Sequence, residues 1–216
     1  MGSVPTLPTP SGPFVVPNFN EPLDVEGVIA QIPDTAQIKG FFVSGYEKML
    51  TAHRPDLAPQ IRAAMPRKSY GSLHNYPRAE VLRAEVALAK VFSPDVSDRE
   101  AIRRATLLVY PMFLSSLLGR VVLSTVGRNV DTVLGLGPRM MSSVTNYGTV
   151  AAQKLEERHW RYYYKDYYSW LDCGDVGVIE GLVTHYGVRP ELTVSMNGPF
   201  EMWLDIKWQA RGQAAS

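Results

Sequence analysis

Four side chains are of the types that combine in a hydrolytic triad. Ser115, Ser116, Asp172 and His185 offer two hydroxyls, a carboxylate and an imidazole. A positioned imidazole and carboxylate can activate a serine as a nucleophile. Neither serine lies in the Gly-x-Ser-x-Gly pattern that exposes a nucleophile on a strand-to-helix turn. The sequence therefore predicts no serine hydrolase at these positions.

Two short stretches share only their composition with functional motifs. Residues 135–143, GLGPRMMSS, match neither the dinucleotide-binding fingerprint nor the phosphate-loop spacing. The Glu156–Glu157 pair falls in an expected turn, where solvated carboxylates are poorly suited to acid–base catalysis. We predict that the protein is not an enzyme.

The cysteine and histidine content limits metal and redox chemistry. The single cysteine, Cys173, excludes an intrachain disulfide and paired-cysteine metal sites, and it favours a reducing compartment. The histidines are too widely spaced to predict a ligand cluster: His53, His74, His159 and His185. We expect no metal site and no cofactor.

Seven aromatic side chains fall within eleven positions, from Trp160 to Trp170. If residues 159–167 form a strand, alternate side chains point to opposite faces. One face then carries Trp160, Tyr162 and Tyr164, which we interpret as sheet core or as one wall of a ligand pocket. The other face carries Arg161, Tyr163 and Lys165, which we interpret as candidates for contact with a protein partner.

A second candidate pocket wall lies on a long apolar helix predicted after Ser97. Tyr110, Phe113, Leu114 and Leu117 have helical spacing, and Pro111 kinks or breaks the helix. Such a helix facing a sheet can leave a slot for an apolar small molecule. The alternative is that these side chains are simply core.

The N-terminal segment contains seven of the sixteen prolines within residues 1–33. Proline at this density excludes a helix or a central strand. The segment is either a disordered tail or an extended arm anchored by apolar residues that include Phe14 and Phe19, lying along its own domain or along a neighbouring subunit. We expect one domain over residues 34–209 and a disordered tail over 210–216.

Charge and hydropathy limit the classes of partner that the protein is expected to bind. The net charge is +1, from 22 basic and 21 acidic residues, which disfavours a nucleic-acid-binding function. Beyond the proline-rich first twenty residues, the longest uncharged stretch, residues 105–119, is fifteen residues long and contains Pro111, so we expect no membrane span. The first sixteen residues lack the basic and apolar regions of a secretory signal, and we predict a cytoplasmic protein.

The predicted elements give an α+β fold. Helical periodicity dominates up to about residue 141, in the segments 34–53, 54–65, 76–92, 97–127 and 129–141. A period of two then predicts strands over 148–156 and 159–167, a helix over 173–187, and a closing hairpin over 190–196 and 200–208. We therefore expect N-terminal helices packed on a small, mostly antiparallel β-β-α-β-β sheet.

Several of these stretches resemble a known family. Residues 38–50 (IKGFFVSGYEKML), 76–89 (YPRAEVLRAEVALA), 117–127 (LLGRVVLSTVG) and the region 146–196 are similar to a family of proteins without assigned function that is expanded as paralogues in myxobacteria. More distantly, VIEGLVTHYG and ELTVSM resemble 4-vinyl reductase domains, TRAPP vesicle-tethering subunits and haem nitric-oxide/oxygen binding domains. This resemblance implies helices on a small antiparallel sheet, with a ligand between the layers in several relatives.

The haem-binding relatives imply a proximal histidine and a Tyr-x-Ser-x-Arg motif. Residues 125–146, where the histidine would lie, contain none. The stretch corresponding to the motif, residues 163–167, reads YYKDY and lacks the serine and the arginine. The resemblance thus implies the fold, and the residues disfavour haem.

Three functional hypotheses follow. The first is a non-enzymatic sensory or scaffold module that self-associates or binds a protein partner, with the N-terminal arm contributing. The second is a carrier or sensor of a hydrophobic small molecule held between the helix 107–122 and the sheet. The third is an enzyme whose active site has no recognisable motif.

Overall fold

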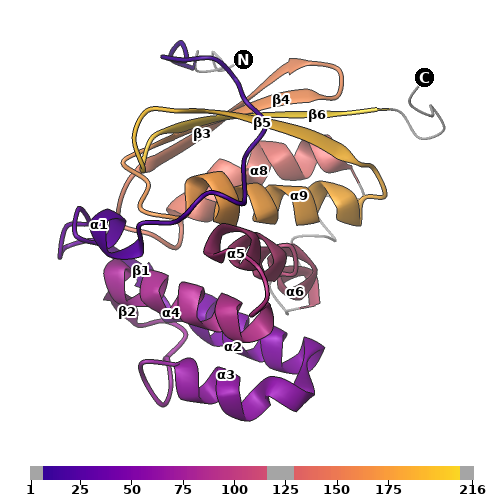
Figure 1. Ribbon diagram of the computed structural model, residues 1–216. Coiled ribbons are helices and arrows are strands. Elements are labelled where there is room, and N and C mark those ends of the chain that lie inside the picture. The colour runs from indigo at the N-terminus through magenta and orange to yellow at the C-terminus, as the bar shows by residue number, and fades with distance from the viewer. Residues whose placement is uncertain (1–6, 116–128, 210–216) are drawn as a thin grey trace.

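The computed structural model describes residues 7–115 and 129–209. Its helices and sheet form stacked layers (Figure 1). A four-stranded sheet forms one outer layer, and helices α8 (Val130–Ser142) and α9 (Val176–His185) lie against its inner face. Helices α5 (Asp98–Thr106) and α6 (Val109–Ser115) lie beneath α9. The expected α+β architecture is confirmed.

The layer furthest from the sheet contains α2 (Gly40–His53), the 3-10 turn Pro55–Leu57, α3 (Ala58–Ala64) and α4 (Arg78–Phe92) (Figure 1). The short helix α1 (Val25–Ile29) lies nearer to the sheet, at one side of the molecule. A small ribbon of β1 (Gln37–Lys39) and β2 (Asn75–Pro77) pairs beside these helices. Within the described residues, no helix is both long and apolar enough to span a bilayer.

The large sheet is antiparallel with the strand order β3-β4-β6-β5. Its strands are β3 (Thr149–Glu156), β4 (His159–Lys165), β5 (Pro190–Met196) and β6 (Met202–Trp208). The central pair β4 and β6 is the most buried because each has a neighbour on both sides. The predicted β-β-α-β-β order is confirmed, with α9 between the two hairpins.

The two largest hydrophobic cores lie one against the sheet and one among the N-terminal helices. The sheet-side core joins the inner face of the sheet to α8 and α9 and includes Tyr162, Leu204 and Ile206. The helix-side core joins α2, α4 and α5 and includes Leu50 and Leu88. The segment after β4 contributes to both, since Tyr167 and Leu171 belong to the first core while Trp170 and Cys173 belong to the second.

Two local predictions need correction. The predicted helix over residues 34–53 begins only at Gly40, because Gln37–Lys39 pair with Asn75–Pro77 as strands. The long helix divides after Thr106 rather than at Pro111, since a proline cannot donate to the carbonyl of Leu107 four residues earlier. This carbonyl instead lies against α9, where a Cβ on Gly181 would collide with it.

The predicted helix over residues 129–141 is confirmed as α8, which continues through its glycines and Pro138 to Ser142. The reason is a tertiary contact. A Cβ on Gly137 would collide with the Tyr162 hydroxyl, so the glycine leaves the space in which that hydroxyl donates to the Leu134 carbonyl. These glycines serve close helix–strand packing.

Candidate functional site

Two of the three predicted pocket residues on β4 are fully engaged in the core. The Trp160 indole donates to the Asp131 carboxylate on α8 at 2.6 Å, and the Tyr162 hydroxyl donates to the Leu134 carbonyl. Both rings are buried against α8. They hold this helix on the sheet and leave no polar group for a ligand.

The predicted pocket residues on α6 are packed in a similar way where the structure describes them. Tyr110 is buried, and its hydroxyl lies 2.8 Å from that of Tyr186. Phe113 packs against the same core. The side chain of Leu114 and the whole of Leu117 lie outside the described residues. The described part of this wall is therefore core.

Tyr164 differs from its neighbours because its hydroxyl is buried and has no hydrogen-bond partner. It belongs to a group of ionisable and hydroxyl-bearing side chains between the two cores. We call this group the buried polar cluster; its members are Arg78, Glu85, Tyr147, Tyr164, Tyr167, Ser169 and Asp175. Ring centroids of Tyr147 and Tyr164 each lie 5.6 Å from that of Tyr167.

Arg78 joins the helical layer to the segment that follows β4. Its side chain, 4% exposed, pairs at 2.7 Å with Glu85, which lies further along α4. It also donates to the Tyr168 carbonyl at 2.6 Å and to the Ser169 hydroxyl at 3.3 Å. Burial lowers the pKa of Arg78, but the charge and hydrogen bond of Glu85 and the neighbouring Tyr147 and Tyr167 together outweigh it, so the pKa stands above its ordinary value.

Asp175 carries the only carboxylate oxygen among the described residues that is buried without a partner. It ends a π-helical turn, Leu171–Asp175, immediately before α9. Its side chain does not cap that helix. Burial raises the pKa of Asp175 to about 7, against the opposing effects of the Ser169 hydroxyl and the charge of Arg78. A π turn and a carboxyl that titrates near neutrality both favour a functional role.

Unsatisfied polar atoms are concentrated at this junction. In the described ranges, they are Tyr46 Oη, Tyr147 Oη, Tyr164 Oη, Trp170 Nε1 and Asp175 Oδ2. A buried polar atom without a partner costs about 1–3 kcal/mol, and proteins retain few of them. Their concentration beside Arg78 and Asp175 marks the junction between helices and sheet as the candidate ligand site.

The sequence contained two weak signals of this site. Asp175 is the one charged residue in the stretch 173–179, CGDVGVI, which is otherwise without polar side chains apart from Cys173. Burying a carboxylate without a partner is costly, so an acid at such a position indicates a functional role. Arg78 and Glu85 have heptad spacing and share a face with the apolar stripe of α4. Neither signal indicates that these side chains meet, because Arg78 contacts Tyr168 from 90 positions away.

The predicted interface residues lie on the outer face of the sheet. Arg161 makes two hydrogen bonds, of 2.5 and 2.8 Å, to the buried Asp205, and the guanidinium stacks on the Phe14 ring at 4.6 Å. Tyr163 stacks on Trp203 at 4.8 Å. Lys165 is exposed. In this structure, the segment that meets this face is the protein's own N-terminal arm.

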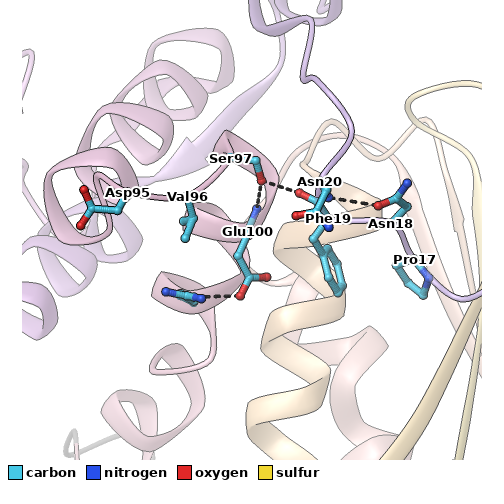
Figure 2. A pocket seen from close by; sticks show the side chains of 9 residues that line it. Pro17, Asn18, Phe19, Asn20, Asp95, Val96, Ser97 and Glu100 are labelled. Atoms are coloured by element: carbon cyan, nitrogen blue, oxygen red, sulfur yellow. Dashed lines mark hydrogen bonds and ion pairs between the residues drawn. The ribbon is translucent and has the colours of Figure 1, made fainter.

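Phe19, the last predicted interface residue, lies away from the sheet. Its ring lies beneath the Arg103 guanidinium of α5 at 4.9 Å. Figure 2 shows the hydrogen bond that Ser97 donates to the Phe19 carbonyl. The arm therefore contacts both the sheet and the helices, and its described part lies along its own domain.

The residues considered for a hydrolytic triad are not brought together where they are described. Asp172 pairs with Arg99, and His185 lies at the other end of α9. A helix of this length separates them by roughly 20 Å. The side chain of Ser115 and all of Ser116 lie outside the described residues. Across the described ranges, no three acidic, cysteine or histidine side chains gather as a metal site.

The architecture is that of the H-NOX class of α+β domains. An H-NOX protein from S. oneidensis in the Fe(II)NO state matches with a TM-score of 0.63, 12% identity, and coverage of 80% of this chain and 100% of that one. The Fe(II) unliganded H-NOX protein from K. algicida gives 0.60, 12%, 82% and 100%, and a mutant H-NOX of T. tengcongensis gives 0.61, 14%, 80% and 98%. This likeness shows the fold.

Over residues 31–209, the chain belongs to the family described as protein of unknown function (DUF2378). No curated protein matched the sequence. The family and the fold agree with the resemblance drawn from the sequence.

The residues at the junction do not fit a histidine-ligated haem. Three histidines, His53, His74 and His185, are exposed, and His159 bonds Asp205 on the outer face of the sheet. A thiolate or a phenolate could also ligate haem iron, but only in its deprotonated form. Burial raises the pKa of the Cys173 thiol and those of the Tyr164 and Tyr167 hydroxyls, which favours their protonated forms. What the junction offers instead is hydroxyls, an indole N–H and a carboxyl.

Proposed function

We propose that the protein is a non-enzymatic sensory module that binds a small hydrogen-bonding molecule at the buried polar cluster. The observation that carries this proposal is the set of unpartnered polar atoms on Tyr147, Tyr164 and Asp175. These atoms lie between the helical layer and the sheet, a position in which one ligand can contact both.

The composition of the cluster defines the ligand. Phenol hydroxyls both donate and accept, the indole of Trp170 donates, and the Asp175 carboxyl accepts, or donates when protonated. The charge of Arg78 is already matched by Glu85, so the cluster offers no unpaired cation for an anionic ligand. Aromatic rings supply the walls. This chemistry favours a small, flat, polar molecule over the apolar ligand that the sequence suggested behind Tyr110.

A ligand at this position would affect several elements together. The unpartnered atoms of Tyr147, Tyr164 and Asp175 are closed to solvent, so a ligand reaches them only when part of the surrounding structure moves. We propose that this part is the segment 166–175. This segment is tied to α5 through the Asp172–Arg99 ion pair, and α9 is tied to α5 through Arg103 and Glu180 at 2.6 Å. Movement of the π turn would therefore be transmitted to α5 and, through α5, to α9. A ligand that binds one arrangement of these elements more tightly than the other shifts the equilibrium between the two arrangements, as a sensor requires.

Replacing each of two neighbouring tyrosines by phenylalanine should change the unfolding free energy in opposite directions. Tyr164→Phe removes a buried hydroxyl without a partner, and we expect it to raise the unfolding free energy by about 1 kcal/mol. Tyr163→Phe removes the hydrogen bond to Glu201 on the outer face and should lower it by about the same amount. Urea unfolding of both variants and of the wild type, each refolded so that no bound molecule contributes, measures this. Equal, destabilising effects would show that the Tyr164 hydroxyl has a structural partner.

Native mass spectrometry tests the binding itself. The purified full chain should carry the added mass of a small molecule, and so should Tyr163→Phe. The double variant Tyr164→Phe/Asp175→Asn should lose it, because two of the unpartnered groups are removed. A wild-type chain without added mass, or a double variant that retains it, would contradict the proposal.

A further inference from the structure

The N-terminal arm crosses the outer face of the sheet in an extended conformation, beside β5 (Figure 1). Three polar contacts fix its register. The Trp203 indole donates to the Pro8 carbonyl at 2.9 Å, the Ser195 hydroxyl donates to the Gly12 carbonyl at 3.0 Å, and Val15 exchanges two backbone hydrogen bonds with Val194 at 2.9 and 2.8 Å. Each contact is a hydrogen bond with backbone atoms of the arm.

The surface beneath the arm has the chemistry of a site for proline-rich segments. We call it the arm groove and define it by Arg161, Tyr163, Val194, Ser195 and Trp203. Stacked aromatic rings with an indole N–H aimed at a carbonyl are typical of polyproline recognition, because prolines keep their carbonyls free and their backbone extended. Pro8, Pro10 and Pro13 give the arm this property.

One side-chain anchor completes the groove. Phe14 stacks on the Arg161 guanidinium, and Asp205, 5% exposed, holds that guanidinium in place. Arg161 is thus positioned from within the sheet, independently of the arm. A site that is built in this way accepts any arm of the same sequence.

The arm is separated from its next anchor by a hinge. Val16 is 75% exposed, and Pro17 and Asn18 follow it before Phe19 is held on α5. Asn18 is exposed as well, and residues 17–20 line an open groove of 560 Å³ together with the start of α5 (Figure 2). Residues 7–15 can therefore leave the arm groove while Phe19 remains in place.

We propose that the arm groove is an intermolecular docking site whose occupant is residues 7–15 of a second copy of this chain. The exchanged arm would make the same contacts with Trp203, Ser195 and Val194. Exchange of an identical element about a short, exposed hinge is an inexpensive route to a dimer, since only the hinge changes conformation. The intramolecular arm competes at an effective concentration on the order of 1 mM, so exchange increases with protein concentration.

A cross-linking experiment separates exchange from intramolecular docking. A Cβ on Gly12 would stand 3.7 Å from the Ser195 side-chain oxygen, close enough for a disulfide between Gly12→Cys and Ser195→Cys. Full-length chains that carry only one of these substitutions are mixed and oxidised. Among the products of twice the 24.0 kDa chain mass, only a disulfide between positions 12 and 195, identified by mass spectrometry of the linked peptides, shows that the arm of one chain occupies the groove of the other; disulfides between two identical variants are not counted.

We expect this cross-linked dimer, with a yield that increases with protein concentration. The double variant Gly12→Cys/Ser195→Cys, oxidised when dilute, should remain monomeric and lose two free thiols, which shows that the pair can bond. Val16→Cys mixed with Ser195→Cys is the matched control and should give at least about tenfold less dimer, since its thiol lies outside the groove register.

Absence of the mixed dimer, with the double variant closing normally, would overturn the proposal. A synthetic peptide of residues 7–16 with Gly12→Cys distinguishes the remaining occupant. If this peptide bonds to Ser195→Cys chains while the chains do not bond to one another, the groove serves another proline-rich chain, and exchange between copies is wrong.

Discussion

Replacing Asp175 by asparagine should make the protein's stability less dependent on pH. Burial raises the pKa of this carboxyl from 3.8 to about 7, so the folded state binds the proton more tightly than the unfolded state does. The stability that protonation confers is complete below pH 4 and is lost as the pH rises towards 7. Asparagine keeps the shape of the protonated acid and does not titrate.

The expected difference follows from linkage. Relative to wild type, Asp175→Asn should gain on the order of 2 kcal/mol in unfolding free energy between pH 5.5 and pH 8. Urea unfolding at the two pH values measures it, with refolded protein so that no bound molecule contributes.

Asp95→Asn is the matched control, since it removes the same charge from an exposed loop and should change the pH dependence little. The groups facing Asp175 across the junction are Arg78, Glu85, Tyr147, Tyr164 and Tyr167. A difference between wild type and Asp175→Asn that is the same at both pH values would show that Asp175 is ionised throughout and has a partner.

Replacing Arg78 by methionine should be the most destabilising single change at the site. The Glu85 carboxylate would lose its buried partner, and the Tyr168 carbonyl would lose its donor. Removing one member of a buried ion pair costs about 3–5 kcal/mol, and the partial exposure of Glu85 places the expectation near 3 kcal/mol. The segment 166–175 should also become less protected from hydrogen exchange.

Arg83→Met provides the comparison within the same helix. Arg83 pairs with Glu26 at 2.7 Å, with side chains 50% and 70% exposed, so its loss should have a much smaller effect. Denaturant unfolding of both variants gives the two values. Similar losses would mean that Arg78 acts through helix stability and does not hold the junction.

The sheet was largely predictable from the sequence because its signal is local. Alternation along residues 159–165 assigns Trp160, Tyr162 and Tyr164 to one face, and the structure places all three on the inner face, against α8 and the junction. The same alternation assigns Arg161 and Tyr163 to the opposite face. Strand periodicity survives folding because each side chain meets only one of two environments.

The helix boundaries were less predictable because distant residues decide them. Gln37–Lys39 have helical spacing but pair with β2, and α8 continues through Gly137 because Tyr162 needs the space that a side chain would fill. Propensity is a weak preference that such contacts override.

The sequence by itself determined the α+β class, the strand order along the chain, the aromatic strand and a proline-rich arm with apolar anchors. The tertiary structure alone decided where the chemistry lies. Arg78 and Asp175 form no motif and meet only because α4 packs against the segment after β4. The contact between the arm and Trp203 likewise depends on the folded sheet, since the two are far apart in the sequence. Periodicity records burial along one element, whereas a site between layers depends on contacts between residues far apart in the chain.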